Sequence, residues 1–428
     1  MDDFGSKLIR VTQNDNVFEV EDILTNILSR LPVKSLLICK SVSKYWRDLI
    51  CSPSFMHSHL VQSQENSSDA FYPSYPSSDD NIPLLTKTDG ETTQSFLDCD
   101  GFYFEGMVCS FNGLICCTNF HGPFVYERIE DSNTFDIHIC NPATREVLVL
   151  PPTPTSEYIP KIGVSFGPTL NEYKVFQFYY RDEQLYECKV YSSIVGSWKS
   201  MGTVPYSPYT SSNHVCINET VFWFSLSMID GRLVGHILAV DKEENFSTIR
   251  IPEEETMRPF LVNLEGCLCL VARHGLGQLD IWALQDSKES VWMKKWSDNI
   301  PQNFNIQGLS YVTVQKNEIL LANWVRSVFY NMETRTWREF NWEHAHEDKF
   351  SLPMAYTESL LPCKYWNVNY GVPSKYGGIF PDFRYNLVLC IKIKKIKWKS
   401  FFFFYFPFYG ARVESWINDH KFFQILWY

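Results

Sequence analysis

The sequence lacks the features that mark several large classes of protein. It has no apolar run of the roughly eighteen residues that a membrane-spanning helix needs, so no span is expected. Its first residues, MDDFGSKLIRVTQNDN, are polar and do not resemble a secretory segment. The net charge of −11 is opposite in sign to that of most nucleic-acid-binding proteins, so no nucleic-acid partner is expected. The 13 cysteines are odd in number and scattered, which favours a reducing compartment, the cytoplasm or the nucleus.

The sequence also has few residues in patterns that support catalysis or metal binding. Cys116-Cys117 and Cys267-Leu268-Cys269 lack the paired spacing of structural zinc sites. No glycine-rich phosphate loop with its lysine is present. We therefore expect no metal, no cofactor and no catalytic residues.

Two local matches to such patterns are better explained by structure. Residues 163–167, GVSFG, match the nucleophile elbow of serine hydrolases, but Pro168 follows directly and no helix can form there. A hydrolase using Ser165 is therefore a minor alternative. His57 and His59 stand two residues apart without a third ligand, which favours surface or cap positions.

What the sequence does contain is ample material for a core. Of its 428 residues, 45% are hydrophobic and 16% are aromatic, which is typical of a globular protein with one large and one small domain. Residues 20–60 form the small one. Apolar residues recur there at helical intervals, Leu31-Pro32 ends the first helix, Ser43 is a candidate N-cap, and Pro53 ends the unit. The apolar residues of the first stripe are Val20, Ile23, Leu24, Ile27, Leu28 and Leu31.

Within this segment, ILSRLPVKSLL followed by SVSKYWRDLICSPSF resembles the F-box of plant F-box proteins. The resemblance implies a three-helix domain that docks on a Skp-type adaptor of a cullin-RING ubiquitin ligase, with Trp46 mainly organising the bundle. The family usually opens with Leu-Pro, whereas Val20-Glu21 stands here, a departure that is expected to weaken adaptor binding. The residues expected to contact the adaptor are Ile23, Leu24, Ile27, Leu31, Pro32, Leu36 and Leu37.

Short strand patterns separated by Gly, Pro and Asn fill the rest of the chain as far as residue 340, which predicts an all-β domain. A weak repeat favours a propeller, because each unit has a strand, a polar turn and a second strand carrying Trp or Phe. We expect these pairs to be the outer hairpins of four-stranded blades, with the rings filling the space between sheets. A β-sandwich with incidental tryptophans is the alternative. The four clearest units are VYSSIVGSWKSM, LAVDKEENFSTIRIP, IWALQDSKESVWMKKW and FYNMETRTWREF.

Several of these segments, among them SFNGLICC, ICNPATREVLVLPP and KVYSSIVGSWKSMG, also look like the F-box-associated interaction domain of plant F-box proteins. The resemblance implies a kelch-like propeller of about six blades that recruits a target protein for ubiquitination, while the chain itself catalyses nothing. Strands from residues 83–104 and 352–359 could complete one blade together. A propeller scaffold with no role in degradation is the alternative function.

The expected organisation is α+β and multidomain, a small helical domain followed by an all-β propeller. The tail contains KIKKIKWKSFFFFYFPFY, which departs from the family; binding to an anionic membrane surface is a minor alternative to a divergent extension. The predicted divisions are 1–19 disordered, 20–60 F-box, 61–81 linker, 82–362 propeller-like domain and 363–428 atypical tail.

Overall fold

The structure is a computed structural model of the 428-residue chain. It describes residues 15–66, 69–73, 81–88, 91–98, 106–119, 135–153, 160–167, 172–182, 185–204, 208, 214–229, 232–252, 259–274, 277–304, 306, 308–315, 318–323, 326–340 and 353–364.

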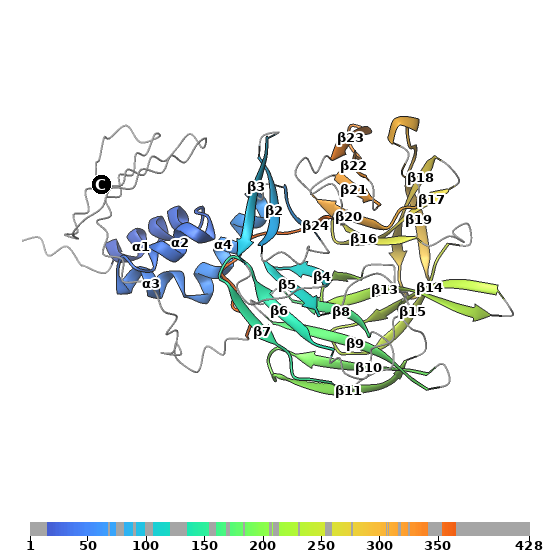
Figure 1. Ribbon diagram of the computed structural model, residues 1–428, viewed down its shortest axis with the longest axis horizontal. Coiled ribbons are helices and arrows are strands. Elements are labelled where there is room, and N and C mark those ends of the chain that lie inside the picture. Colours follow the sequence, from blue (N-terminus) through green and yellow to red (C-terminus); the bar gives the residue numbers. More distant parts are fainter. Residues whose placement is uncertain are drawn as a thin grey trace, which may run out of the picture. The chain divides into compact units, whose positions relative to one another are not determined.

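Helices come first along the chain (Figure 1). The predicted N-cap is confirmed, because the backbone N–H of Trp46 donates to Ser43 Oγ at 3.1 Å. Ser52 Oγ accepts from the N–H of Phe55 in the same way, and Pro53 occupies the first helical position, where its missing N–H is harmless. The four helices are α1 (Asp15–Leu28), α2 (Val33–Cys39), α3 (Lys44–Ile50) and α4 (Pro53–Asn66).

Two predicted boundaries in this region are wrong. Helix α1 begins at Asp15, inside the segment 1–19 predicted to be disordered, because the apolar spacing continues upstream of residue 20. The predicted linker, 61–81, instead contains the end of α4 and a strand, β1 (Asp69–Pro73). Strand β1 pairs with β2 and with the distant β24, and the composition of residues 61–81 does not predict this pairing.

The described strands form six antiparallel sheets of four strands each (Figure 1). In order, the first sheet contains β1, β2 (Asn81–Thr88), β3 (Glu91–Asp98) and β24 (Pro353–Ala355); the second β4 (Gly106–Phe111), β5 (Leu114–Thr118), β6 (Ile137–Asn141) and β7 (Glu146–Val149); the third β8 (Lys161–Phe166), β9 (Tyr173–Asp182), β10 (Leu185–Ser192) and β11 (Ser197–Val204); the fourth β12 (Val215–Ile217), β13 (Thr220–Ile229), β14 (Arg232–Val240) and β15 (Phe246–Arg250); the fifth β16 (Phe260–Leu264), β17 (Cys267–His274), β18 (Gln278–Asp286) and β19 (Val291–Asn299); the sixth β20 (Tyr311–Gln315), β21 (Glu318–Ala322), β22 (Ser327–Asn331) and β23 (Thr336–Phe340).

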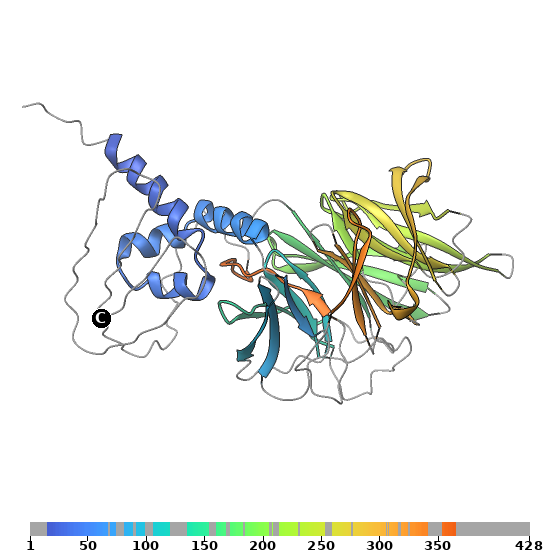
Figure 2. The same cartoon turned by 90° about the horizontal axis from the view of Figure 1, so that it is seen from above.

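The first sheet joins strands from both ends of the β region. Strand β24 pairs antiparallel with β1, through Phe71 opposite Ala355 and Tyr72 opposite Met354. Figure 2 shows β24, in orange, beside the blue strands of this sheet. The prediction that segments near 83–104 and 352–359 share one sheet is therefore confirmed.

The sheets follow one another around a ring. The strands β4, β8, β12, β16, β20 and β24 each contact the next in this series, and β24 also contacts β4. Each of them lies at one edge of its own sheet. The arrangement is a β-propeller, so the sandwich alternative is wrong.

The core lies between neighbouring sheets. Trp223 of the fourth sheet is buried, and its ring contacts Phe176 and Phe178 of the third sheet edge-on, with ring centres 5.7 and 5.1 Å away. Leu320 and Phe329 of the sixth sheet likewise pack against Ala355 of the first. The prediction that large rings fill the space between sheets is confirmed.

The predicted outer hairpins are also present, and their turns share one geometry. Asn141, Asp286 and Asn331 each accept two backbone N–H groups from the turn that follows. All three turns end in a residue with positive φ: Arg145 at 59°, Ser290 at 56° and Arg335 at 54°. The weak repeat in the sequence therefore reflects one turn design used in several sheets.

Two of the recurring tryptophans tie neighbouring sheets together at their outer strands. Trp198 Nε1 donates to the carbonyl of Pro151 and Trp292 Nε1 to that of Arg250, both at 2.8 Å. In each case the acceptor follows or ends the outer strand of the preceding sheet. This explains why tryptophan recurs near the start of the fourth strand.

Candidate protein-binding surfaces

Helices α1 and α2 present apolar side chains at the surface. Ile23 of α1 is 58% exposed, and Pro32, between the two helices, is exposed as well. A single exposed isoleucine is common at protein surfaces, so the grouping of exposed and half-buried apolar side chains on these two helices is the feature of interest. Four more of the predicted adaptor contacts are half-buried, so each shows part of its side chain: Leu24, Ile27, Leu31 and Leu37.

One predicted contact residue does not lie at this surface. Leu36 is 0% exposed, because α2 begins at Val33 and its buried stripe consists of Val33, Leu36 and Cys39. Leu36 therefore supports the helical domain and cannot itself touch a partner. The sequence analysis missed Ile38, which is 45% exposed on the same helix. The signal in the sequence was the three-residue spacing of apolar residues from Val33, which places Leu36 on the buried side of α2 and leaves Ile38 off it.

A buried histidine holds the end of the first helical segment. His59 of α4 lies 3.0 Å from the carbonyl of Leu31 through Nε2, and since a carbonyl only accepts, this nitrogen donates. The carbonyl precedes Pro32 and has no helical partner of its own. Burial lowers the pKa of His59, although the contact with Leu31 opposes the shift. His59 is therefore a buried cap of this segment and does not lie at the surface.

Ser165 is a structural residue of β8. Its hydroxyl donates to the carbonyl of Glu219 in the next sheet at 2.7 Å, and β8 turns into another strand, not into a helix. A nucleophile elbow needs a strand followed by a sharp turn and a helix. One residue earlier, the N–H of Val164 donates to His214 Nε2 at 3.0 Å, and burial lowers the pKa of His214 to about 4.

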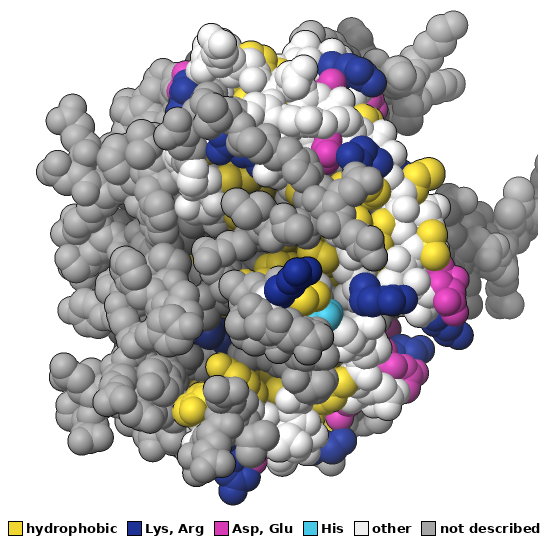
Figure 3. Space-filling model, turned by 90° about the vertical axis from the view of Figure 1, so that its right-hand side faces the viewer, with side chains coloured by type: hydrophobic (Ala, Val, Ile, Leu, Met, Phe, Trp, Pro, Cys, Tyr) yellow, Lys and Arg dark blue, Asp and Glu magenta, His cyan; other side chains and the backbone are white. Residues whose placement is uncertain are grey.

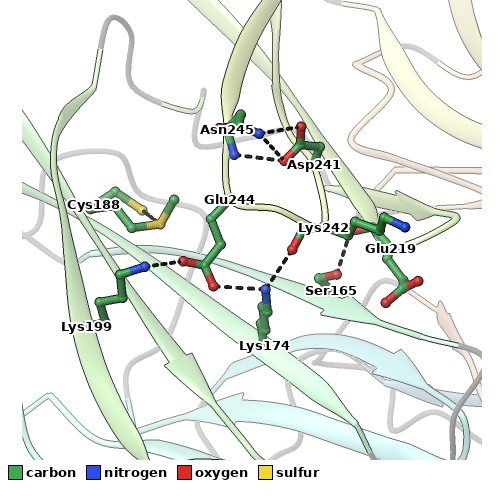
Figure 4. Close-up of polar contacts among 10 residues, drawn as sticks. Ser165, Lys174, Cys188, Lys199, Glu219, Asp241, Lys242, Glu244 and Asn245 are labelled. Atoms are coloured by element: carbon green, nitrogen blue, oxygen red, sulfur yellow. Dashed lines mark hydrogen bonds and ion pairs between the residues drawn. The ribbon is translucent and has the colours of Figure 1, made fainter.

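An ion-pair cluster joins the third and fourth sheets (Figure 4). Glu244, in the turn between β14 and β15, accepts from Lys174 Nζ at 2.9 Å and from Lys199 Nζ at 2.8 Å. Burial would raise the pKa of Glu244, but the hydrogen bonds from Lys199 and Lys174 outweigh it and lower the pKa. Lys174 Nζ also donates to the carbonyl of Lys242 at 2.9 Å. The cluster therefore links the third and fourth sheets.

The described part of the chain contains no group of three or more His, Cys, Asp or Glu residues arranged to hold a metal ion. Its helices are also too short or too polar to cross a membrane. The eleven cysteines within the described ranges are all free thiols.

The two ends of the ring differ. Because the same up-and-down order recurs around one ring, the turns that join first to second and third to fourth strands share one end. Residues 356–364, which we call the C-terminal strap, pack against this end of the second and third sheets. There the strap contacts Gly113, Asn141 and Tyr173. The end of each fourth strand and the start of each first strand lie at the opposite end of the ring.

Hydrophobic side chains also reach the surface of the propeller, between charged ones (Figure 3). Val195, at the tip of the β10–β11 turn, is 72% exposed. Three sheets contribute such residues, so among the described residues they do not define a single binding patch. The others are Val149, Ile194, Val291 and Met293.

A short helical domain followed by a ring of antiparallel sheets defines a modular β-propeller protein. The chain belongs to the family of the F-box associated beta propeller domain, whose model matches residues 59–369. The F-box domain model matches residues 20–58, directly before it. Both resemblances read from the sequence are thereby confirmed, whereas the kelch-like character of the propeller stays a prediction.

Among the proteins similar to this chain are F-box proteins of Arabidopsis thaliana. The F-box/LRR-repeat protein At2g43260 is 26% identical over 312 residues, which cover 67% of this chain and 68% of the relative. F-box protein At2g21930 is 24% identical, covering 74% and 84%. F-box protein CPR1 is 23% identical over 395 residues, covering 80% and 89%. The similarity to these three relatives thus covers between 67% and 80% of this chain.

Proposed function

We propose that the chain is the substrate-recognition subunit of a Skp-cullin-F-box ubiquitin ligase. The observation that carries the proposal is the apolar surface of α1 and α2, with Ile23 58% and Ile38 45% exposed in a segment that matches the F-box model. A Skp-type adaptor would cover this surface. The chain would contribute no bond-making step itself and would act by raising the concentration of a target near the ligase.

The propeller would hold the target protein. The end of the ring opposite the C-terminal strap is the better candidate surface, because the strap already covers the turns of the second and third sheets. Recognition residues would then come from the connections between sheets, since binding residues are commonly carried on loops positioned by a rigid scaffold. The free thiols agree with work in the cytoplasm or nucleus.

The test is adaptor binding by the double variant Ile23→Asp/Ile38→Asp. Both side chains are exposed, so the helices should stay folded while binding of a purified Skp-type adaptor falls about 100-fold or more, measured by calorimetry. Val61→Asp, which changes a 36% exposed valine on α4, is the matched control and should bind normally. Circular dichroism checks the fold. Unchanged adaptor affinity in the double variant would overturn the proposal.

A scaffold without a ligase role is the second candidate, favoured by one departure from the family. Val20-Glu21 replaces the usual Leu-Pro opening of the F-box motif. If the unaltered chain binds no purified Skp-type adaptor in the same calorimetry, the scaffold is favoured over the ligase subunit.

A further inference from the structure

The C-terminal strap is held more firmly than a chain end that simply follows the last strand. Five of its side chains are almost fully buried. Residues of β6, β7 and β9, in the second and third sheets, donate or accept hydrogen bonds along it. The buried residues are Tyr356, Ser359, Leu360, Leu361 and Cys363.

Asn141 is the central anchor. Its side chain is 0% exposed, and Nδ2 donates to the carbonyls of Ser359 at 3.0 Å and Leu361 at 2.7 Å. The Oδ1 atom of the same amide accepts the backbone N–H groups of Ala143 and Thr144 in the turn. One side chain therefore uses both its donors and its acceptor to join the β6–β7 turn to the strap.

Two further contacts flank this anchor. The hydroxyl of the buried Tyr173 donates to the carbonyl of Cys363 at 2.7 Å, while Cys363 Sγ donates to the carbonyl of Glu146 at 3.4 Å. Gly113 lies so close that a Cβ there would be 2.3 Å from Ser359 Oγ, and its φ of +80° also favours glycine. The strap is thus fitted against the second sheet along its length.

The strand that the strap follows has only a short backbone pairing, although Met354 and Ala355 pack in the core between sheets. Strand β24 is three residues long and pairs with β1 at three positions, whereas β2 and β3 of the same sheet pair at eight. We propose that the strap is a lock on the ring: it keeps β24 in the first sheet, so that without it the seam between β1 and β24 opens before the other sheets unfold. Local opening of this kind, below the global unfolding free energy, is a general property of proteins.

Hydrogen exchange of the full-length chain, read by mass spectrometry, tests the lock with Asn141→Asp. An aspartate can keep the turn, as Asp286 does in the fifth sheet, but it presents an oxygen to the two strap carbonyls where Asn141 donated. We expect exchange in residues 353–364 and 69–73 to be faster by about ten- to a hundredfold, with the third to sixth sheets unchanged.

The matched control is Asn331→Asp. Asn331 caps the corresponding turn of the sixth sheet through Oδ1, and among the described residues no hydrogen bond joins it to the strap. This variant should leave exchange at 353–364 as it was. If Asn141→Asp does not fold, Tyr173→Phe, which removes only the hydroxyl donor, should accelerate the same peptides about fivefold. No acceleration, or equal acceleration in every sheet, would overturn the proposal whether or not the chain serves a ligase.

Discussion

At the scale of single residues, buried histidines set how the protein responds to acid. His214 Nε2 accepts the N–H of Val164, so the folded state needs the neutral imidazole. Burial lowers the pKa of His214 to about 4, below the value of about 6.5 in an unfolded chain. The unfolded chain therefore takes up the proton first, and the stability that His214 contributes is present above about pH 6.5 and lost as the pH falls towards 4.

His214→Gln should remove this part of the acid sensitivity. The glutamine oxygen can accept from Val164 without titrating, so the variant should be close to wild type at pH 7 and should lose less Tm than wild type between pH 7 and 4.5. Other histidines with lowered pKa, such as His59 and His138, are present in wild type and variant alike, so they change the Tm of both by the same amount. Parallel Tm curves for the two proteins over this range would show that His214 does not titrate as described.

At the scale of elements, the Glu244 cluster links the third and fourth sheets. Glu244 has φ of +71°, an unfavourable conformation for a residue with a side chain, and its carboxylate contacts two lysines there. Its lowered pKa means that the contribution is present above the unfolded value of about 4.3 and is lost as the pH falls through the folded pKa.

Glu244→Gln keeps the size of the side chain and removes its charge. We expect a loss of about 1 kcal/mol and a Tm lower by about 2–4 °C in low salt, with a smaller loss in high salt, measured by thermal unfolding. The neighbouring Glu243→Gln is the control, since the Glu243 side chain is exposed and its carboxylate lies 3.6 Å from Lys242 of the same turn. Equal losses in the two variants would mean that the cluster does not couple the sheets.

Sequence patterns predicted the elements better than their partners. The outer hairpins, the Ser43 cap and the rings between sheets follow from local signals, namely alternation, turn residues and side-chain size. The placement of β1 could not be predicted, because it depends on a strand almost three hundred residues away in the chain. Leu36 was expected at the adaptor surface because of the resemblance to the F-box, whereas the structure buries it with Val33 and Cys39 on one side of α2.

At the scale of the whole molecule, the end of the propeller lies beyond the boundary read from the sequence. The predicted domain ended at residue 362, and the family model continues to residue 369. The described structure explains part of the difference, because Cys363 closes the strap against Tyr173 and Glu146. Hydrogen bonds to a backbone carbonyl leave no mark in the sequence of the residue that accepts them, so this boundary was not readable from composition.

Two truncated chains test the boundary. A chain ending at Lys364 keeps Cys363 and its carbonyl, whereas one ending at Pro362 leaves the buried Tyr173 hydroxyl without its acceptor. An unpaired buried polar group costs about 1–3 kcal/mol, so the shorter chain should have a Tm several degrees lower in thermal unfolding. Tyr173→Phe in both chains is the control: it removes the unpaired hydroxyl and should shrink the difference. Equal Tm values before that substitution would place the end of the domain at residue 362.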